Sequence, residues 1–131
     1  MAKKELSQAE ITSAMVDMWT LLTEEQQALV AQHLEVRRYK KNQTIYSEGE
    51  KPSHLLCLLD GKVKIYREGV CGRNQIMRII KPVEYFGYRA YFADERFVTA
   101  AAAFEASVVC WIPMDIISAL VKANNRLAMF F

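Results

Sequence analysis

Short apolar segments fill the middle of the chain, whereas longer amphipathic segments lie at its two ends. All five glycines fall between Gly49 and Gly87, and glycine supplies the backbone conformations that tight turns require. Between these turns the apolar runs are too short for helices, and several alternate with polar residues as half-buried strands do. The pattern predicts a mainly β core over residues 36–112, framed by helices.

Apolar residues near the N-terminus recur at steps of three and four, which predicts two helices within residues 1–35 that pack on one side of the core. Residues 7–10 and 23–26 each have the form of a capping box, which marks a helix start. Residues 113–131 predict a helix whose first turn Pro113 fixes, a break at Asn124-Asn125, and the start of another helix. The apolar faces of the N-terminal helices would carry Ile11, Ala14, Met15, Met18, Trp19, Leu22, Leu29, Val30, His33 and Leu34.

Three segments of the β region carry specific expectations. Asp60-Gly61 is the strongest two-residue hairpin signal in the chain, so the strands on either side of it are expected to pair. Residues 87–95 lack alternation and predict a helical turn and loop, after which a strand restarts at residues 97–99. The four alanines that begin at Ala100 favour a helix by propensity, but a strand is the better prediction because a second strand-like run follows after only a short polar break.

Composition and charge narrow the class of protein. The chain has 131 residues, enough for one domain with a sizeable core. Its 17 basic and 15 acidic side chains give a formal net charge of +2, without the clustered basic face of a nucleic-acid-binding protein. Three cysteines without a CxxC pair favour a reduced, cytoplasmic protein. No apolar run is long enough to span a membrane.

The candidate chemistry gives no support for an enzyme. A cupin-type metalloenzyme, the least favoured alternative, needs clustered histidine and carboxylate ligands, but the only histidines are His33 and His54, each without another ligand at useful spacing. Neither a nucleophile elbow nor a glycine-rich phosphate loop occurs. The sequence therefore predicts a protein without catalytic residues, metal ligands or a resident cofactor.

Arginines and aromatic residues gather around Gly87. The planar guanidinium group suits a phosphate or carboxylate, and a glycine that opens a helical turn can help to hold an anion. Surface charge balance and plain core packing are the alternative explanations. The candidate ligand-binding residues are Gly87, Tyr88, Arg89 and Ala90, with Arg96, Val98, Thr99 and Ala100 opposite them.

Three motifs, in this order and spacing, resemble the cyclic nucleotide-binding domain of CRP/FNR-type bacterial transcription regulators. They are Glu48-Gly49-Glu50 before a buried strand, the run DGKVKIY from Asp60, and Phe86-Gly87 before a short helix. The resemblance covers nearly everything from Trp19 to Phe131. It implies a jelly-roll-like β-roll (a double-stranded β-helix) with flanking helices, and a homodimer formed through a long helix that would start within residues 124–131. It also implies that DNA is bound only through a helix-turn-helix domain, which this chain lacks. Because the chain ends on apolar side chains that need cover, we expect the natural chain to continue.

The resemblance fails at the positions that hold the nucleotide. Family members that bind cyclic AMP place a glutamate after this glycine and later an Arg-Ser or Arg-Thr pair on the cyclic phosphate. Here Tyr88 follows Gly87, and the expected pair falls on Phe97-Val98 or Val98-Thr99. The prediction is an effector-sensing and dimerisation domain that does not bind cyclic AMP in the usual way. It has either another small or anionic molecule as its effector or no effector at all. The alternative is a stand-alone interaction module without effector or DNA.

Overall fold

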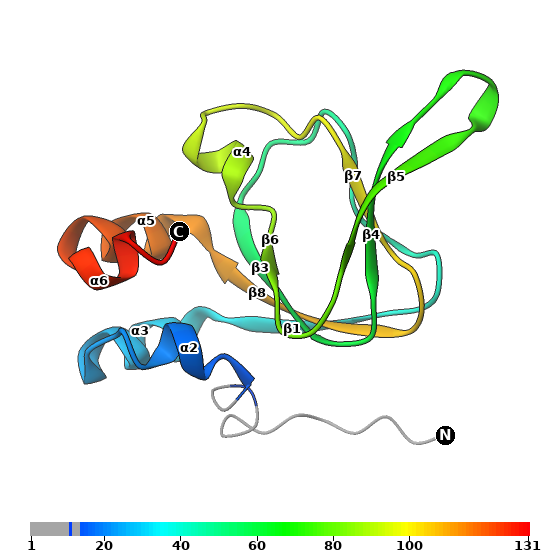
Figure 1. The fold of residues 1–131 in the computed structure, drawn as a ribbon. Helices are drawn as coiled ribbons and strands as arrows, with labels where there is room; N and C mark the ends of the chain where they lie inside the picture. Colours follow the sequence, from blue (N-terminus) through cyan, green and yellow to red (C-terminus); the bar gives the residue numbers. More distant parts are fainter. Residues whose placement is uncertain (1–10, 12–13) are drawn as a thin grey trace.

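Eight strands form two four-stranded antiparallel sheets in the part of the chain that the computed structural model describes, Ile11 and residues 14–131 (Figure 1). The first sheet has the order β1-β8-β3-β6, from Glu35–Tyr39, Ser107–Pro113, His54–Asp60 and Tyr85–Phe86. The second has the order β2-β7-β4-β5, from Thr44–Tyr46, Ala100–Ala103, Val63–Glu68 and Asn74–Ile80. This arrangement confirms the expected mainly β architecture with flanking helices.

The helices α2, α3, α5 and α6 gather at one end of the roll, whereas α4 lies apart from them beside β6 (Figure 1). The capping box at the start of α3 is confirmed: Thr23 Oγ1 accepts from the Gln26 N–H at 3.2 Å, and the Gln26 side chain accepts from the Thr23 N–H at 3.0 Å. The other expected box, residues 7–10, lies outside the described residues. The bounds of the helices are Val16–Trp19 (α2), Glu24–His33 (α3), Arg89–Phe92 (α4), Met114–Ala123 (α5) and Asn125–Ala128 (α6).

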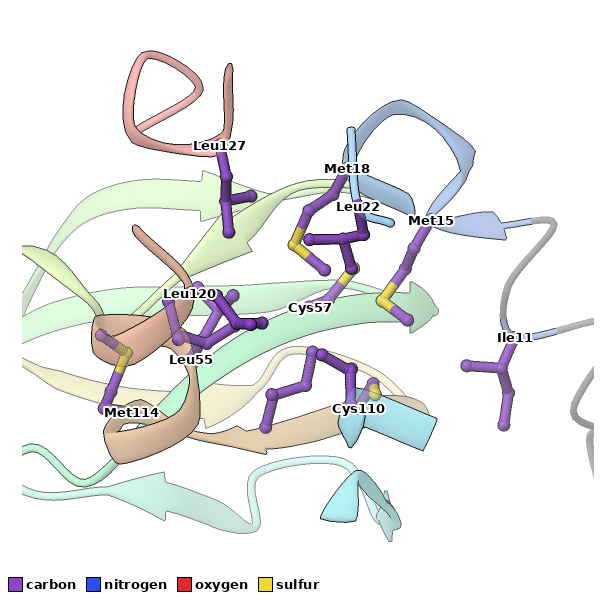
Figure 2. Packing of buried hydrophobic residues seen from close by; sticks show 13 residues of the cluster. Ile11, Met15, Met18, Leu22, Leu55, Cys57, Cys110, Met114, Leu120 and Leu127 are labelled. Atoms are coloured by element: carbon purple, nitrogen blue, oxygen red, sulfur yellow. The ribbon is translucent and has the colours of Figure 1, made fainter. Parts of the chain in front are cut away.

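Alternate residues of β3 and β8 face two different cores. Cys57 and Cys110 point toward the helices, where they pack with apolar residues of α2, α5 and α6 (Figure 2). Leu56 and Trp111 point toward the second sheet. A strand that is buried on both faces needs apolar residues at every position. This double burial explains why the β3 and β8 segments are uninterrupted apolar runs.

The N-terminal apolar face is only partly as expected. Ile11, Met15, Met18 and Leu22 are buried, but α3 contributes only Val30 to the buried core. Leu29 is 37% exposed, and His33 lies at the surface. The α3 helix therefore contributes little to the buried core, whereas Met15, Met18 and Leu22, which precede it, are part of that core.

The turn at Asp60-Gly61 joins the two sheets, so the expected β-hairpin is wrong. β3 pairs with β6 and β8, and β4 pairs with β5 and β7. Gly61 has φ +97°, and a Cβ at this position would collide with Ser107 and the Ala106 carbonyl. The Lys62 N–H also donates to Ser107 Oγ at 3.2 Å. The turn between β3 and β4 therefore requires glycine at position 61, because it packs closely against the start of β8 and is hydrogen-bonded to it.

The segment after α4 contains one confirmed and one wrong expectation. Ala100–Ala103 forms strand β7, as predicted, and all four alanines are buried. Residues 97–99 were expected to be strand but form a loop. The Phe97 N–H donates to Glu50 O at 3.0 Å, and Phe97 O accepts from the Gly49 N–H at 2.8 Å. These bonds join two loops and leave Val98 62% exposed.

The C-terminal aromatic residues are partly covered by their own chain. Phe130 and Phe131 are half-buried and pack against the helix-side core. That they become fully buried only in a dimer or a longer chain stays a prediction. The α6 helix is a single turn, Asn125–Ala128, that follows α5 after Asn124. That this segment begins a long helix stays a prediction. Pro113 is the last residue of β8 and the cap of α5, one position before the expected first turn.

Candidate functional site

A cavity of about 250 Å³ lies between α4 and the roll. It brings together most of the expected site: Gly87, Tyr88, Arg89, Ala90, Val98 and Thr99 all line it. Gly87 has φ +78°, and a Cβ there would press on the Leu56 side chain. Glycine therefore allows the chain to turn from β6 into α4 while staying in contact with β3.

The floor of the cavity comes from residues that the sequence analysis did not assign to the site. Tyr46 and Phe97 are stacked, with ring centroids 3.8 Å apart and planes 12° apart. Ile65 and Arg78 are cross-strand partners on β4 and β5, next to an irregularity in the pairing. The lining residues outside the expected ligand-binding set are Tyr46, Ile65, Arg78, Ile80, Tyr85, Phe86 and Phe97. Of these, Arg78, Tyr85, Phe86 and Phe97 belong to the arginines and aromatic residues that gather around Gly87 in the sequence. Stacked rings and aliphatic side chains make this floor largely apolar.

The polar groups of the cavity cluster around Arg78. Its Nη2 donates to Glu84 Oε2 at 2.8 Å, and Glu84 Oε1 accepts from the Lys81 N–H at 2.8 Å. Burial raises the pKa of Tyr46 to about 12, while a side-chain hydrogen bond with Thr99 and the charge of Arg78 act in the opposite direction. The Tyr46 hydroxyl, the Thr99 hydroxyl and the Arg78 guanidinium group are therefore neighbours in the cavity wall.

Two expected site residues lie elsewhere. Arg96 Nη1 donates to Gly49 O at 3.0 Å, and the residue lines a second, larger hollow of about 710 Å³. Ala100 faces away from the cavity and packs with Tyr66 and Ala102. The larger hollow is walled mostly by exposed charges of both signs, such as Lys51 and Asp94. The smaller cavity is the better candidate because a largely apolar wall with a few polar groups is typical of ligand sites.

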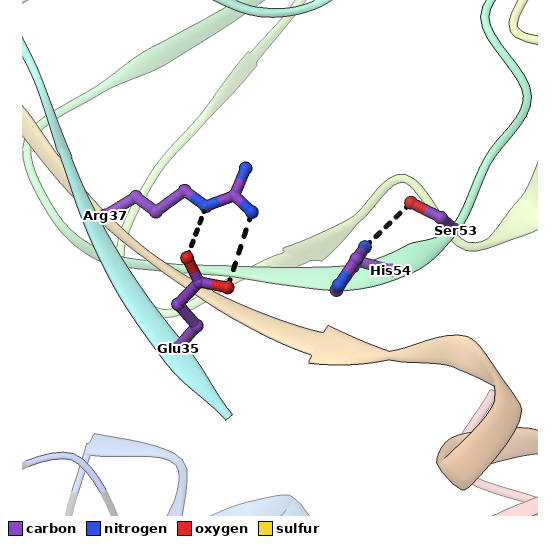
Figure 3. A network of polar contacts seen from close by, with 4 residues as sticks. All are labelled: Glu35, Arg37, Ser53 and His54. Atoms are coloured by element: carbon purple, nitrogen blue, oxygen red, sulfur yellow. Dashed lines mark hydrogen bonds and ion pairs between the residues drawn. The ribbon is translucent and has the colours of Figure 1, made fainter. Parts of the chain in front are cut away.

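A separate group of polar contacts lies at the start of β1 and β3 (Figure 3). Arg37 Nε donates to Glu35 Oε1 at 3.0 Å, and the Arg37 guanidinium group lies 4.0 Å from the centre of the Trp111 ring. His54 Nδ1 lies 2.7 Å from Ser53 Oγ. Burial is the main cause of a lowered pKa for His54. The His54 ring also meets the Trp111 ring edge to face, with centroids 5.2 Å apart. The contacts of Trp111 with Arg37 and His54 therefore join β1, β3 and β8, which is a structural role.

Neither the metal-binding nor the thiol candidates form a site in the described part of the chain. No group of three or more His, Cys, Asp or Glu side chains there could hold a metal ion. Cys57 and Cys110 are cross-strand partners and both are buried, whereas Cys71 is exposed. Burial raises the pKa of the Cys57 thiol, and it raises that of Cys110 to about 12. Among the same residues, no helix has the length and apolar character needed to cross a membrane.

The C-terminal segment contacts the residues that border the cavity. The ring centroid of Phe131 lies 5.2 Å from that of Tyr88 and 6.2 Å from that of Phe92. Phe130 meets Tyr85 edge to face, with centroids 5.4 Å apart. Tyr85 also donates from its hydroxyl to Asp17 Oδ1 at 3.0 Å. The α4 turn and β6 therefore lie between the cavity and the helices at the end of the roll.

The fold defines a β-roll domain with a helical turn inserted between β6 and β7. The family model for the cyclic nucleotide-binding domain matches residues 36–124. The chain therefore belongs to the cyclic nucleotide-binding domain family.

Individual relatives agree with this assignment. A cGMP-dependent protein kinase of Eimeria tenella is 33% identical over 104 residues, which are 79% of this chain and 10% of the kinase. A CRP-like cAMP-activated global transcriptional regulator of Mycobacterium tuberculosis is 31% identical over 65 residues, 50% of this chain and 29% of that protein. The sensor domain of the transcriptional regulator DNR from Pseudomonas aeruginosa superposes with a TM-score of 0.81 at 21% identity, over 93% of this chain and 81% of that one. The chain spans less than two thirds of the length of the curated relatives that it matches.

Proposed function

We propose that this chain is the effector-sensing domain of a CRP/FNR-like transcriptional regulator of the cytoplasm, and that the cavity beside α4 is its effector site. One observation carries the proposal. Tyr88 lines the cavity and also contacts Phe131, so an occupant that moves α4 changes the packing of the C-terminal segment. An effector can shift such a domain only if it interacts differently with two packing states.

The effector is not cyclic AMP bound in the usual way. Tyr88 stands where cyclic AMP-binding members have a glutamate, and Val98-Thr99 stands at one of the two positions where the arginine pair is expected. Arg96, the nearest candidate to replace that arginine, is held by Gly49 O outside the cavity. The arginines that do line the cavity, Arg78 and Arg89, come from other positions of the chain, so a cyclic phosphate would not be held by the usual arginine pair.

The rest of the regulator follows from the same assignment. The sensing domain would form a homodimer through the segment that begins after Asn124, and a helix-turn-helix domain outside this chain would bind DNA. Effector binding would repack the C-terminal segment against α4 and so change the orientation of the DNA-binding domain. No catalytic role is assigned to the chain.

Native mass spectrometry combined with amide hydrogen exchange tests this proposal. The protein is purified from cells, examined for a retained small molecule, and compared with the same protein after unfolding and refolding remove that molecule. We expect slower exchange at residues 125–131 in the loaded protein, because α4 and the C-terminal segment are in contact. A retained molecule whose removal leaves exchange at these residues unchanged would contradict a sensing role.

A further inference from the structure

We infer that the cavity takes a small aromatic carboxylate, with its single anionic group at Arg78 and its ring against the apolar floor. This inference rests on the proposed function, because it names the class of effector for the same cavity. It depends on the size of the cavity, on its charge and on the nature of its walls.

The size of the cavity sets an upper limit on the ligand. Sites for drug-sized ligands usually measure about 300–1,000 Å³, and this cavity holds about 250 Å³. The Tyr46 and Phe97 rings are stacked on each other, with centroids 3.8 Å apart, so the ring of a ligand cannot enter between them. A ligand with one ring and a short side chain fits this space better than a ribose joined to a purine.

The charges at the cavity favour one negative charge on the ligand. Arg78 and Arg89 line the cavity, and no Asp or Glu is among its lining residues. The Glu84 carboxylate lies just outside the cavity, where it accepts hydrogen bonds from Arg78 Nη2 and from the Lys81 N–H. Two guanidinium groups and one adjacent carboxylate leave a surplus of one positive charge. The remaining donors of the Arg78 fork can bind a carboxylate in the geometry that arginine prefers.

Apart from Arg78 and Arg89, the lining residues are uncharged, which disfavours other ligands that carry an anionic group. The sugar hydroxyl and base amino groups of a nucleotide are donors, and no lining residue offers a carboxylate to accept from them. Inorganic phosphate would leave the apolar floor uncovered by any ligand atom. An aromatic carboxylate satisfies both parts: Arg78, Tyr46 and Thr99 line the same cavity and would bind its oxygens, while Ile65, Ile80 and Phe97 would cover its ring.

Calorimetric titration of the 131-residue chain tests the inference. The probes are benzoate, phenylacetate and 3-phenylpropionate, with benzamide as the neutral analogue, acetate as the anion without a ring, inorganic phosphate and cyclic AMP. We expect at least one aromatic carboxylate to bind about ten times more tightly than benzamide, because a hydrogen bond to a charged group contributes about 1.5–3 kcal/mol. It should also bind more tightly than acetate, which has no ring to cover the apolar floor.

Variants show whether the ligand sits where the geometry places it. Arg78→Gln should weaken binding of the best carboxylate about 10- to 100-fold, and Tyr46→Phe should weaken it about threefold to tenfold. Arg67→Gln is the matched control, since Arg67 lies on the same β4–β5 hairpin, is exposed and does not line the cavity. Unfolding midpoints of all variants show whether each remains folded, and benzamide titration gives a second measure of an intact floor.

The outcomes separate this inference from the proposed function. Tighter binding of cyclic AMP or phosphate than of every aromatic carboxylate would overturn the ligand class and leave the sensing role standing. Carboxylate binding that Arg78→Gln does not weaken would overturn the site assignment, and the absence of binding by any aromatic carboxylate would overturn the inference itself. Carboxylate binding without altered hydrogen exchange at residues 125–131 would support the inference and contradict the sensing role.

Discussion

The contact between Tyr88 and Phe131 can be measured as a coupling free energy. The two rings have centroids 5.2 Å apart and planes inclined at 56°, a geometry in which aromatic pairs contribute about 0.5–1.5 kcal/mol beyond the area that they bury. We compare Tyr88→Leu, Phe131→Leu and the double variant, because leucine keeps most of the apolar bulk. The free energy of unfolding of each protein, from urea denaturation, should give a coupling energy of about 1 kcal/mol.

A second pair provides the control for this cycle. Phe104 lies in the turn between β7 and β8, is 44% exposed, and has no ring contact with Tyr88 among the described residues. Tyr88→Leu and Phe104→Leu should therefore be additive within about 0.5 kcal/mol. A Tyr88–Phe131 coupling no larger than this control value would refute the argument that α4 communicates with the C-terminal segment through its aromatic contacts.

Two further predictions concern the scaffold around the cavity. Gly61→Ala should destabilise the fold by about 2–5 kcal/mol, because a left-handed backbone and a collision add together. Gly72→Ala, at φ +73° with open space around it, should cost only about 1–2 kcal/mol; equal unfolding midpoints for the two variants would contradict the close approach at Gly61. The pKa of Glu84 is lowered from its usual value of 4.5, first by the backbone hydrogen bond from Lys81 and then by Arg78. The Glu84 carboxylate therefore stabilises the fold above pH 4.5, and this stabilisation is lost as the pH falls through the lowered pKa. Urea midpoints of the natural protein and Glu84→Gln should differ at pH 7 and converge toward pH 3, whereas a constant difference would count against the ion pair.

The local sequence pattern predicts most strands of this molecule because the burial of a segment outweighs its intrinsic helix or strand propensity. By propensity alone Ala100–Ala103 would form a helix, but the short polar break before the next strand-like run favours a strand. The structure buries all four alanines between β2 and β4. The Thr23 capping box and the helical turn after Gly87 could also be predicted from the sequence, since each depends on residues that are close together along the chain.

The cavity could be predicted only in part because its floor depends on how the strands are assigned to sheets. The residues near Gly87 are contiguous, so the sequence places them together. Tyr46, Ile65 and Arg78 come from three strands of the second sheet, and they meet the α4 turn because the chain changes sheets at Gly61. A local pattern that assigns a hairpin to Gly61 pairs β3 with β4 and therefore cannot bring these side chains to the site.

The three cysteines differ in exposure, so that a spectroscopic label can be attached selectively to one of them. Cys71 is exposed at the tip of the β4–β5 hairpin, whereas Cys57 and Cys110 are buried with pKa values raised by that burial. Thiol-directed reagents react with the accessible thiolate, so a maleimide fluorophore or spin label should attach at one position in the natural sequence. Such a label would report on the tip of the β4–β5 hairpin without any engineered cysteine.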